Sequence, residues 1–197
     1  IEVSRGSEVF TSTAVAIAPG LAITAAHCID CADEVVILLG EDYKKPDHVL
    51  ECDHWIIHPG YDPRNSFYEN DIAIIYLRDQ FPRGMNYEVL EDSIHLDHKS
   101  LIERIGFGGR ENQNIKTWTN PNFQSITFNK KNFILNDNSS VIGDSGGPVY
   151  KEEQGVLKLI GIHSTLEKTD HGPITYIVNT AFYKDWIMEH LKMNKAI

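Results

Sequence analysis

Short apolar runs rich in valine, isoleucine and threonine recur along this chain of 197 residues. Clusters of turn-forming residues, such as "KKPD", "HPGYDPRN" and "NDNSS", separate these runs. Many short strands punctuated in this way are typical of antiparallel sandwiches and barrels. We therefore predict an all-β fold with strands over residues 13–18, 21–26, 34–40, 71–77, 122–128, 156–164 and 174–179.

The C-terminal end has a different period. Apolar residues between positions 180 and 195 recur at the spacing of one helical face, namely Phe182, Trp186, Ile187 and Leu191. This pattern predicts a C-terminal α-helix. The polar stretch from Glu91 to Glu103 has no clear period, and it is either a crossing between two halves of the fold or a surface loop.

Charge and hydropathy exclude several classes of partner. The net charge is −10, whereas nucleic acids and anionic membranes both select a basic surface. No apolar run approaches the roughly 18 residues of a membrane span. We predict no nucleic-acid partner and no membrane partner. The three cysteines, Cys28, Cys31 and Cys52, cannot all pair within one chain, so a short-range disulfide and buried thiols both remain open.

Ser145 stands among small and turn-forming residues in "VIGDSGGPVY". A serine hydroxyl is a poor nucleophile at neutral pH, so it needs a base, and the base needs an orienting acid. His27 follows an apolar run in "ITAAHC", and Asp71 heads another in "NDIAII". Burying such an acid is costly unless it is hydrogen-bonded, and a histidine N–H is a natural donor. We therefore predict a catalytic triad of His27, Asp71 and Ser145.

The "GDSGG" motif also fits the G-x-S-x-G nucleophile elbow of α/β-hydrolases. Those enzymes carry the serine first, then the acid, then the histidine. Asp170 and His171 follow Ser145, but they are adjacent and leave no room for strand and helix units between them. The chain order and the lack of strand–helix alternation therefore exclude the elbow.

The segments "TAAHC", "NDIAI" and "GDSGGP", in this order, resemble the signature blocks of chymotrypsin/trypsin-like serine proteases. Shorter matches, "LGED", "HPGYDP", "GFGGR" and "GIHS", extend the resemblance over most of the chain. It implies two antiparallel Greek-key β-barrels with the C-terminal helix. Residues 1–95 would form the barrel that carries the histidine and aspartate, and residues 96–197 the barrel that carries the serine.

The resemblance also implies a function and assigns roles. The chain would be a monomeric, secreted or periplasmic serine endopeptidase that cleaves protein or peptide substrates through an acyl-enzyme. His27 would act as general base and then general acid, Asp71 would hold its tautomer, and Ser145 would attack the scissile carbonyl. The backbone amides of Gly143 and Ser145 would form the oxyanion hole. Ser164 would support Asp71 and line the substrate strand.

The resemblance predicts a special partner for Asp144. In the family, the acid at this position pairs with the α-ammonium of a newly cut N-terminus, which is usually isoleucine or valine, and this chain begins at Ile1. We therefore expect a zymogen that an activating protease cuts before Ile1. The chain departs from the family in its opening, because it begins "IEVSRG" where relatives begin I-V-G-G. The family's disulfide partner for Cys28 would fall near Ser12, so that bridge is absent.

Two substrate pockets compete. Ser139 falls at the pocket base where trypsins carry an aspartate, so a preference for lysine or arginine loses its charge partner. In the first pocket, His163 and Ser140 bind a glutamate or aspartate side chain, as the likeness of "GIHS" to glutamyl-specific bacterial members implies. In the second, Leu166 and Ser139 line a shallow pocket for a small or medium apolar residue, and His163 is only a wall residue.

We expect no metal and no other cofactor. The loop after "LGED" is short and carries Lys44 and Lys45 where calcium would need oxygen ligands. His54 and His58 lie four residues apart in a strand-like pattern, which separates them by about 13 Å. The alternative function is a catalytically inactive protein that keeps the protease fold for binding or regulation. Such proteins generally lose a triad residue, and all three are present here.

Overall fold

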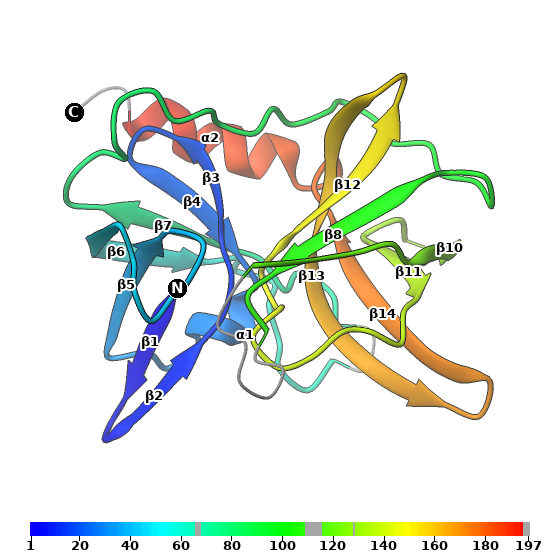
Figure 1. The fold of residues 1–197 in the computed structure, drawn as a ribbon, viewed down its shortest axis with the longest axis horizontal. Coiled ribbons are helices and arrows are strands. Elements are labelled where there is room, and N and C mark those ends of the chain that lie inside the picture. The colour runs from blue at the N-terminus through cyan, green and yellow to red at the C-terminus, as the bar shows by residue number, and fades with distance from the viewer. Residues whose placement is uncertain (66–67, 109–115, 128, 195–197) are drawn as a thin grey trace.

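Two seven-stranded antiparallel sheets follow one another along the chain (Figure 1). The computed structural model describes residues 1–65, 68–108, 116–127 and 129–194. The first sheet has the order β2-β1-β5-β6-β7-β4-β3, with β1 (Glu2–Arg5), β2 (Glu8–Thr11), β3 (Val15–Ala18), β4 (Leu21–Thr24), β5 (Glu34–Leu39), β6 (His48–Ile57) and β7 (Ala73–Leu77). The second has the order β10-β11-β14-β13-β12-β8-β9, with β8 (Ile102–Gly106), β9 (Thr117–Thr119), β10 (Asn122–Ile126), β11 (Asn132–Asn136), β12 (Pro148–Glu153), β13 (Val156–Thr169) and β14 (Gly172–Asn179). With the C-terminal helix described below, this confirms the predicted all-β fold class.

Every run predicted as a strand contains one, although the ends shift by a few residues. The predicted runs leave out β1, β2, β6, β8, β9, β11 and β12, although the pattern around His54 in β6 is strand-like. These strands are short or polar; β1 reads EVSR and β12 reads PVYKEE. In an antiparallel sheet one buried face is enough to hold a strand, so polar residues can occupy the other. β8 follows this rule, because Ile102, Arg104 and Gly106 are buried while the residues between them are partly exposed.

Among the described residues, buried apolar side chains form a cluster within each sheet and a further cluster that spans both sheets. One cluster joins Leu21 and Ile74 of the first sheet to Leu159 and Ile162 of the second, with Ile187 from the C-terminal helix. Burying each such side chain contributes roughly 1.5–3 kcal/mol. This shared cluster joins the two sheets, and it fixes the loops at their junction relative to one another.

The segment between β7 and β8 crosses from one sheet to the other (Figure 1). Glu88 contacts both sheets, because its amide donates to the Ala16 carbonyl at 3.1 Å and its carboxylate accepts from the Tyr150 hydroxyl at 2.7 Å. Of the two interpretations of residues 91–103, the crossing is therefore the one observed. The predicted division after residue 95 falls within this segment and remains a prediction.

The C-terminal helix α2 spans Lys184–Asn194, beginning later than predicted because residues 181–183 form a turn. It packs on the first sheet, where the Tyr76 hydroxyl lies 2.9 Å from His190 Nδ1. His54 and His58, the two histidines that we do not expect to bind a metal, lie nearby. His54 stacks on Tyr76, and His58 packs against Trp186. Within the described ranges, no helix has the length and apolar character needed to span a membrane.

All three cysteines are free thiols, so of the two open alternatives the short-range disulfide is not the one observed. Cys28 and Cys52 are buried, which matches the alternative of buried thiols. Cys31 has a left-handed φ of 57° and is exposed, with its Sγ 3.6 Å from Asp30 Oδ1. The thiols of Cys28 and Cys31 therefore lie on opposite sides of the turn, one inward and one toward solvent.

Candidate active site

His27 and Asp71 meet where two paired strands bring their ends together. β4 and β7 pair in the register Thr24↔Ala73, so the residues after β4 lie beside those before β7. His27 lies in α1 (Ala26–Ile29), the short helix that follows β4. Its Nδ1 lies 2.7 Å from Asp71 Oδ2, and its backbone amide donates to Asp71 Oδ1 at 2.9 Å. The carboxylate of Asp71, which is 2% exposed, is thus hydrogen-bonded to both the ring and the backbone of the histidine.

Contacts that sequence reasoning missed hold this pair in place. Asn70 has a left-handed φ of 57°, a conformation that asparagine tolerates better than most residues. The buried Tyr183 hydroxyl accepts from the Asn70 amide at 3.0 Å and donates to Asn70 Oδ1 at 3.1 Å. On the other side, Arg5 Nη2 donates to the carbonyls of His27 and Cys28, both at 2.9 Å. An asparagine directly before a buried aspartate is a signal for the first contact; the sequence carries none for Arg5.

The electrostatics keep Asp71 ionised and His27 basic. Burial alone would raise the pKa of Asp71, but hydrogen bonds from His27 and Ser164 lower that pKa below its usual value. Burial disfavours a charged imidazole, yet the neighbouring Asp71 carboxylate raises the pKa of His27 above its usual value. The carboxylate also selects the tautomer with the proton on Nδ1, which leaves Nε2 as an acceptor.

Ser145 reaches this pair through Ser164 on β13. The Ser164 hydroxyl donates to Asp71 Oδ2 at 2.5 Å, while the Ser164 carbonyl accepts from Ser145 Oγ at 3.0 Å. Within the described part of the chain, no hydrogen bond joins Ser145 directly to His27, whose Nε2 lies 3.7 Å from Cys28 Sγ. The four predicted residues are therefore brought together, with the serine hydroxyl turned toward Ser164. Catalytic hydrogen bonds are often formed only when substrate binds.

Thr13 fixes the loop that carries Ser145. Its amide donates to the Ser145 carbonyl at 2.9 Å, and its hydroxyl donates to the Gly143 carbonyl at 2.8 Å. Both carbonyls are thereby turned toward the first sheet. Among the described residues, the amides of Gly143 and Ser145 have no hydrogen-bond partner. Two unpaired amides beside a serine hydroxyl are the chemistry that an oxyanion hole requires.

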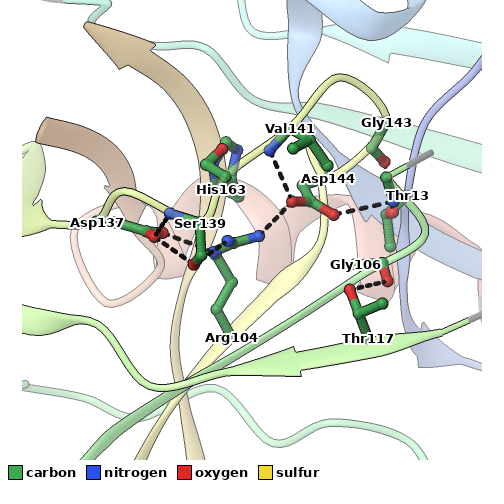
Figure 2. A network of polar contacts seen from close by, with 12 residues as sticks. Thr13, Arg104, Gly106, Thr117, Asp137, Ser139, Val141, Gly143, Asp144 and His163 are labelled. Atoms are coloured by element: carbon green, nitrogen blue, oxygen red, sulfur yellow. Dashed lines mark hydrogen bonds and ion pairs between the residues drawn. The ribbon is translucent and has the colours of Figure 1, made fainter. Parts of the chain in front are cut away.

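The structure does not bring Ile1 and Asp144 together. The Ile1 α-amino group donates to the Ser12 carbonyl at 2.7 Å. Asp144 instead pairs with Arg104, whose Nη1 lies 2.6 Å from Asp144 Oδ2 (Figure 2). The expected ion pair is therefore replaced by one within the second sheet. A signal for it existed in the sequence, because Arg104 occupies an alternating position between Ile102 and Gly106 where an apolar residue would be usual.

The predicted pocket residues lie close to this ion pair. Ser140 Oγ is 2.7 Å from His163 Nε2, and His163 is 2% exposed. The Ser139 hydroxyl donates to Asp137 Oδ1 at 2.6 Å and accepts from Arg104 at 3.2 Å. Burial and the positive charge of Arg104 lower the pKa of His163, so its ring is neutral near pH 7. Leu166 lies further along β13, partly buried and paired with Thr175 on β14.

The fold and the site define a chymotrypsin-like serine protease domain. A comparison with known protein families matches the family described as Trypsin over residues 1–187. The chain therefore belongs to the trypsin family, as the three signature segments predicted. Gly109 and Arg110 of the "GFGGR" segment lie outside the described residues.

Proposed function

We propose that this trypsin-family domain is an active serine endopeptidase that cleaves peptide bonds through an acyl-enzyme. The observation that carries the proposal is the buried Asp71 carboxylate, which holds His27 Nδ1 at 2.7 Å and thereby makes Nε2 the ring nitrogen that accepts a proton. A binding protein would have no need of a buried carboxylate that orients a histidine beside a serine. Peptide substrates follow from the family.

The reaction begins with a rotation of the Ser145 side chain from the Ser164 carbonyl toward His27 Nε2. The Ser145 oxygen then bonds to the substrate carbonyl carbon, and its proton passes to Nε2. His27 returns that proton to the leaving nitrogen as the carbon–nitrogen bond breaks, which leaves an ester on Ser145. Water repeats the sequence, with His27 as base, and releases the acid. The Gly143 and Ser145 amides stabilise the oxyanion at both stages.

For the residue before the cut, we propose a small or medium apolar side chain. An acidic side chain would need a positive pocket, but His163 is neutral near pH 7, and Arg104 faces two carboxylates, Asp137 and Asp144. Asp137 accepts hydrogen bonds from Arg104 and Ser139, so it does not serve as a partner for a lysine or arginine side chain of the substrate. Ile142, 95% exposed beside the oxyanion loop, adds an apolar surface for the substrate.

A peptide library varied only at the residue before the cut tests this specificity. We expect kcat/KM for alanine, valine or leucine to exceed that for glutamate and lysine by roughly tenfold or more, the scale on which apolar pockets discriminate. The Ser145→Ala protein serves as the blank. Preferred cleavage after glutamate, lost in His163→Gln, would instead establish the acidic pocket and refute the apolar one.

The location, the oligomeric state and the partners are inferred from the family resemblance and from charge alone. We propose secretion or a periplasmic location, a monomeric state, and no nucleic-acid or membrane partner, as expected for an acidic extracellular hydrolase. Activation by a protease that frees Ile1 is not proposed, because Asp144 already has a partner within the chain.

A further inference from the structure

Both oxygens of the Asp144 carboxylate accept hydrogen bonds from groups of the second sheet and its loops. Oδ2 accepts from Arg104 Nη1 at 2.6 Å and from the Val141 amide at 3.0 Å, while Oδ1 accepts from the Gly108 amide at 2.9 Å. Both side chains of the ion pair are at most 2% exposed. An aspartate held in this way has a cation and three hydrogen-bond donors from within the chain, without any group from the N-terminus.

Arg104 joins this aspartate to the base of the predicted substrate pocket. Its Nε donates to Asp137 Oδ2 at 2.9 Å and its Nη2 to Ser139 Oγ at 3.2 Å. Figure 2 shows the guanidinium group lying between Asp137 and Ser139 on one side and Asp144 on the other. The planar, permanently charged guanidinium can hold two carboxylates at once, which a lysine ammonium does less well. One side chain thus links the pocket base to the loop that carries Ser145.

The neighbouring backbone is shaped to admit this carboxylate. A Cβ added to Gly106 would lie 2.1 Å from Asp144 Oδ1, and one added to Gly108 would lie 2.6 Å from the same atom. A side chain at Gly106 would therefore collide with the Asp144 carboxylate, and one at Gly108 would collide with Val141 and with the same carboxylate. The glycines of β8 and of the turn after it are therefore part of the same arrangement.

The N-terminal amine has a separate environment. It donates to the Ser12 carbonyl at 2.7 Å, and Ile1 packs in the core of the first sheet beside Val3 and Ile37. Burial lowers the pKa of this amine to about 6, so at neutral pH it is mostly uncharged where it lies. It supplies no cation to the oxyanion loop.

We propose that Arg104 is the resident cation that holds Asp144, and with it the oxyanion loop, in the catalytic position, so that hydrolysis needs no free α-amino group. This inference rests on the proposed endopeptidase function. Arg104 touches neither substrate nor reacting atoms, so it is a positioning residue. Its loss should weaken the oxyanion hole, and should therefore lower kcat more than it changes KM.

Two preparations of the chain test the independence from the amine, one beginning at Ile1 and one with Gly-Ser added before it. We expect kcat/KM on a peptide substrate to agree within about threefold, because the amine contributes no ion pair to the site. A loss of about 100-fold or more in the extended chain would overturn the inference. If the chain beginning at Ile1 neither cleaves peptides nor reacts with a serine-directed reagent, the proposed function fails instead.

Substitutions test the role of Arg104 itself. Arg104→Met should lower kcat by roughly 100-fold with KM changed by less than about threefold, the scale seen when an oxyanion donor is lost. Arg104→Lys, which keeps the charge, should recover at least tenfold of that loss. Arg78→Met, at an exposed arginine paired with Glu51, is the matched control and should be unchanged. Full kcat in a folded Arg104→Met protein would contradict the proposal. If that variant does not fold, the Gly-Ser extension decides the question.

Discussion

A Ser145→Ala variant is expected to fold normally and to lose peptide hydrolysis by a factor of about 10⁶ in kcat, as when the nucleophile of a triad is removed. The reason is that no acyl-enzyme can form without the hydroxyl, so His27 and the oxyanion amides lose the step on which they act. Among the described residues, the hydroxyl has one hydrogen-bond partner, the Ser164 carbonyl, so its removal should cost only about 1 kcal/mol of stability. Steady-state kinetics on a peptide substrate and a thermal unfolding curve measure the two effects.

Ser100→Ala is the matched control for this variant. The Ser100 hydroxyl also donates a hydrogen bond, to the carboxylate of Asp97. Both residues lie on the segment between the sheets, away from the site. It should retain full activity. Residual hydrolysis of more than about 1% in Ser145→Ala, shown to belong to the protein itself, would mean that another group is the nucleophile.

An Asp71→Asn variant should lower kcat by about 10⁴, the loss found when the acid of a serine protease triad becomes an amide. An asparagine that turns its NH₂ toward His27 Nδ1 forces the ring proton onto Nε2. The nitrogen facing Ser145 then cannot accept a proton. The same NH₂ would meet the Ser164 hydroxyl, which now donates to Asp71 Oδ2 at 2.5 Å.

The pH dependence of kcat/KM provides a second test of the Asp71→Asn variant. His27 must be neutral to act as a base, so kcat/KM falls as pH drops through its pKa. Because Asp71 raises that pKa, the midpoint of the acidic limb in the native protein should lie above 6.5, the ordinary value for histidine. In Asp71→Asn the midpoint of the residual activity should move to lower pH.

Asp53→Asn is the control for both measurements. Asp53 also pairs with a histidine, His54, at 2.8 Å, but both side chains are more than half exposed. An exposed pair of this kind contributes little, so kcat/KM and its pH midpoint should stay as in the native protein. An acidic limb that is identical in native protein and Asp71→Asn would show that His27 is not the titrating base.

Much of the site could be predicted because its chemistry is confined to short segments. His27, Asp71 and Ser145 each lie at the junction of an apolar strand and a turn, where a polar residue is conspicuous. The register of β4 and β7 then brings the first two together. The strands with one polar face, such as β1 and β12, were not predicted. Their alternation of apolar and polar residues is too short to be distinguished from a loop.

What the sequence pattern missed depends on contacts between distant segments. Asp144 needed a cation, and the family resemblance pointed to Ile1; only the pairing of β8 with β12 brings Arg104 beneath the serine loop. Thr13 contacts Gly143 across 130 positions of sequence. The state of Cys28 and Cys31 stayed open for a related reason, since spacing says nothing about the side of the chain toward which each thiol points.

Reaction with a fluorophosphonate ester, a reagent that phosphorylates activated serines, tests the central claim most directly. We expect one equivalent of label on Ser145, identified by mass spectrometry of the digested protein, and its loss in His27→Ala as well as in Ser145→Ala. A correctly folded native protein that takes up no label, or labels equally without His27, would contradict it and would favour a protease-like fold used for binding alone.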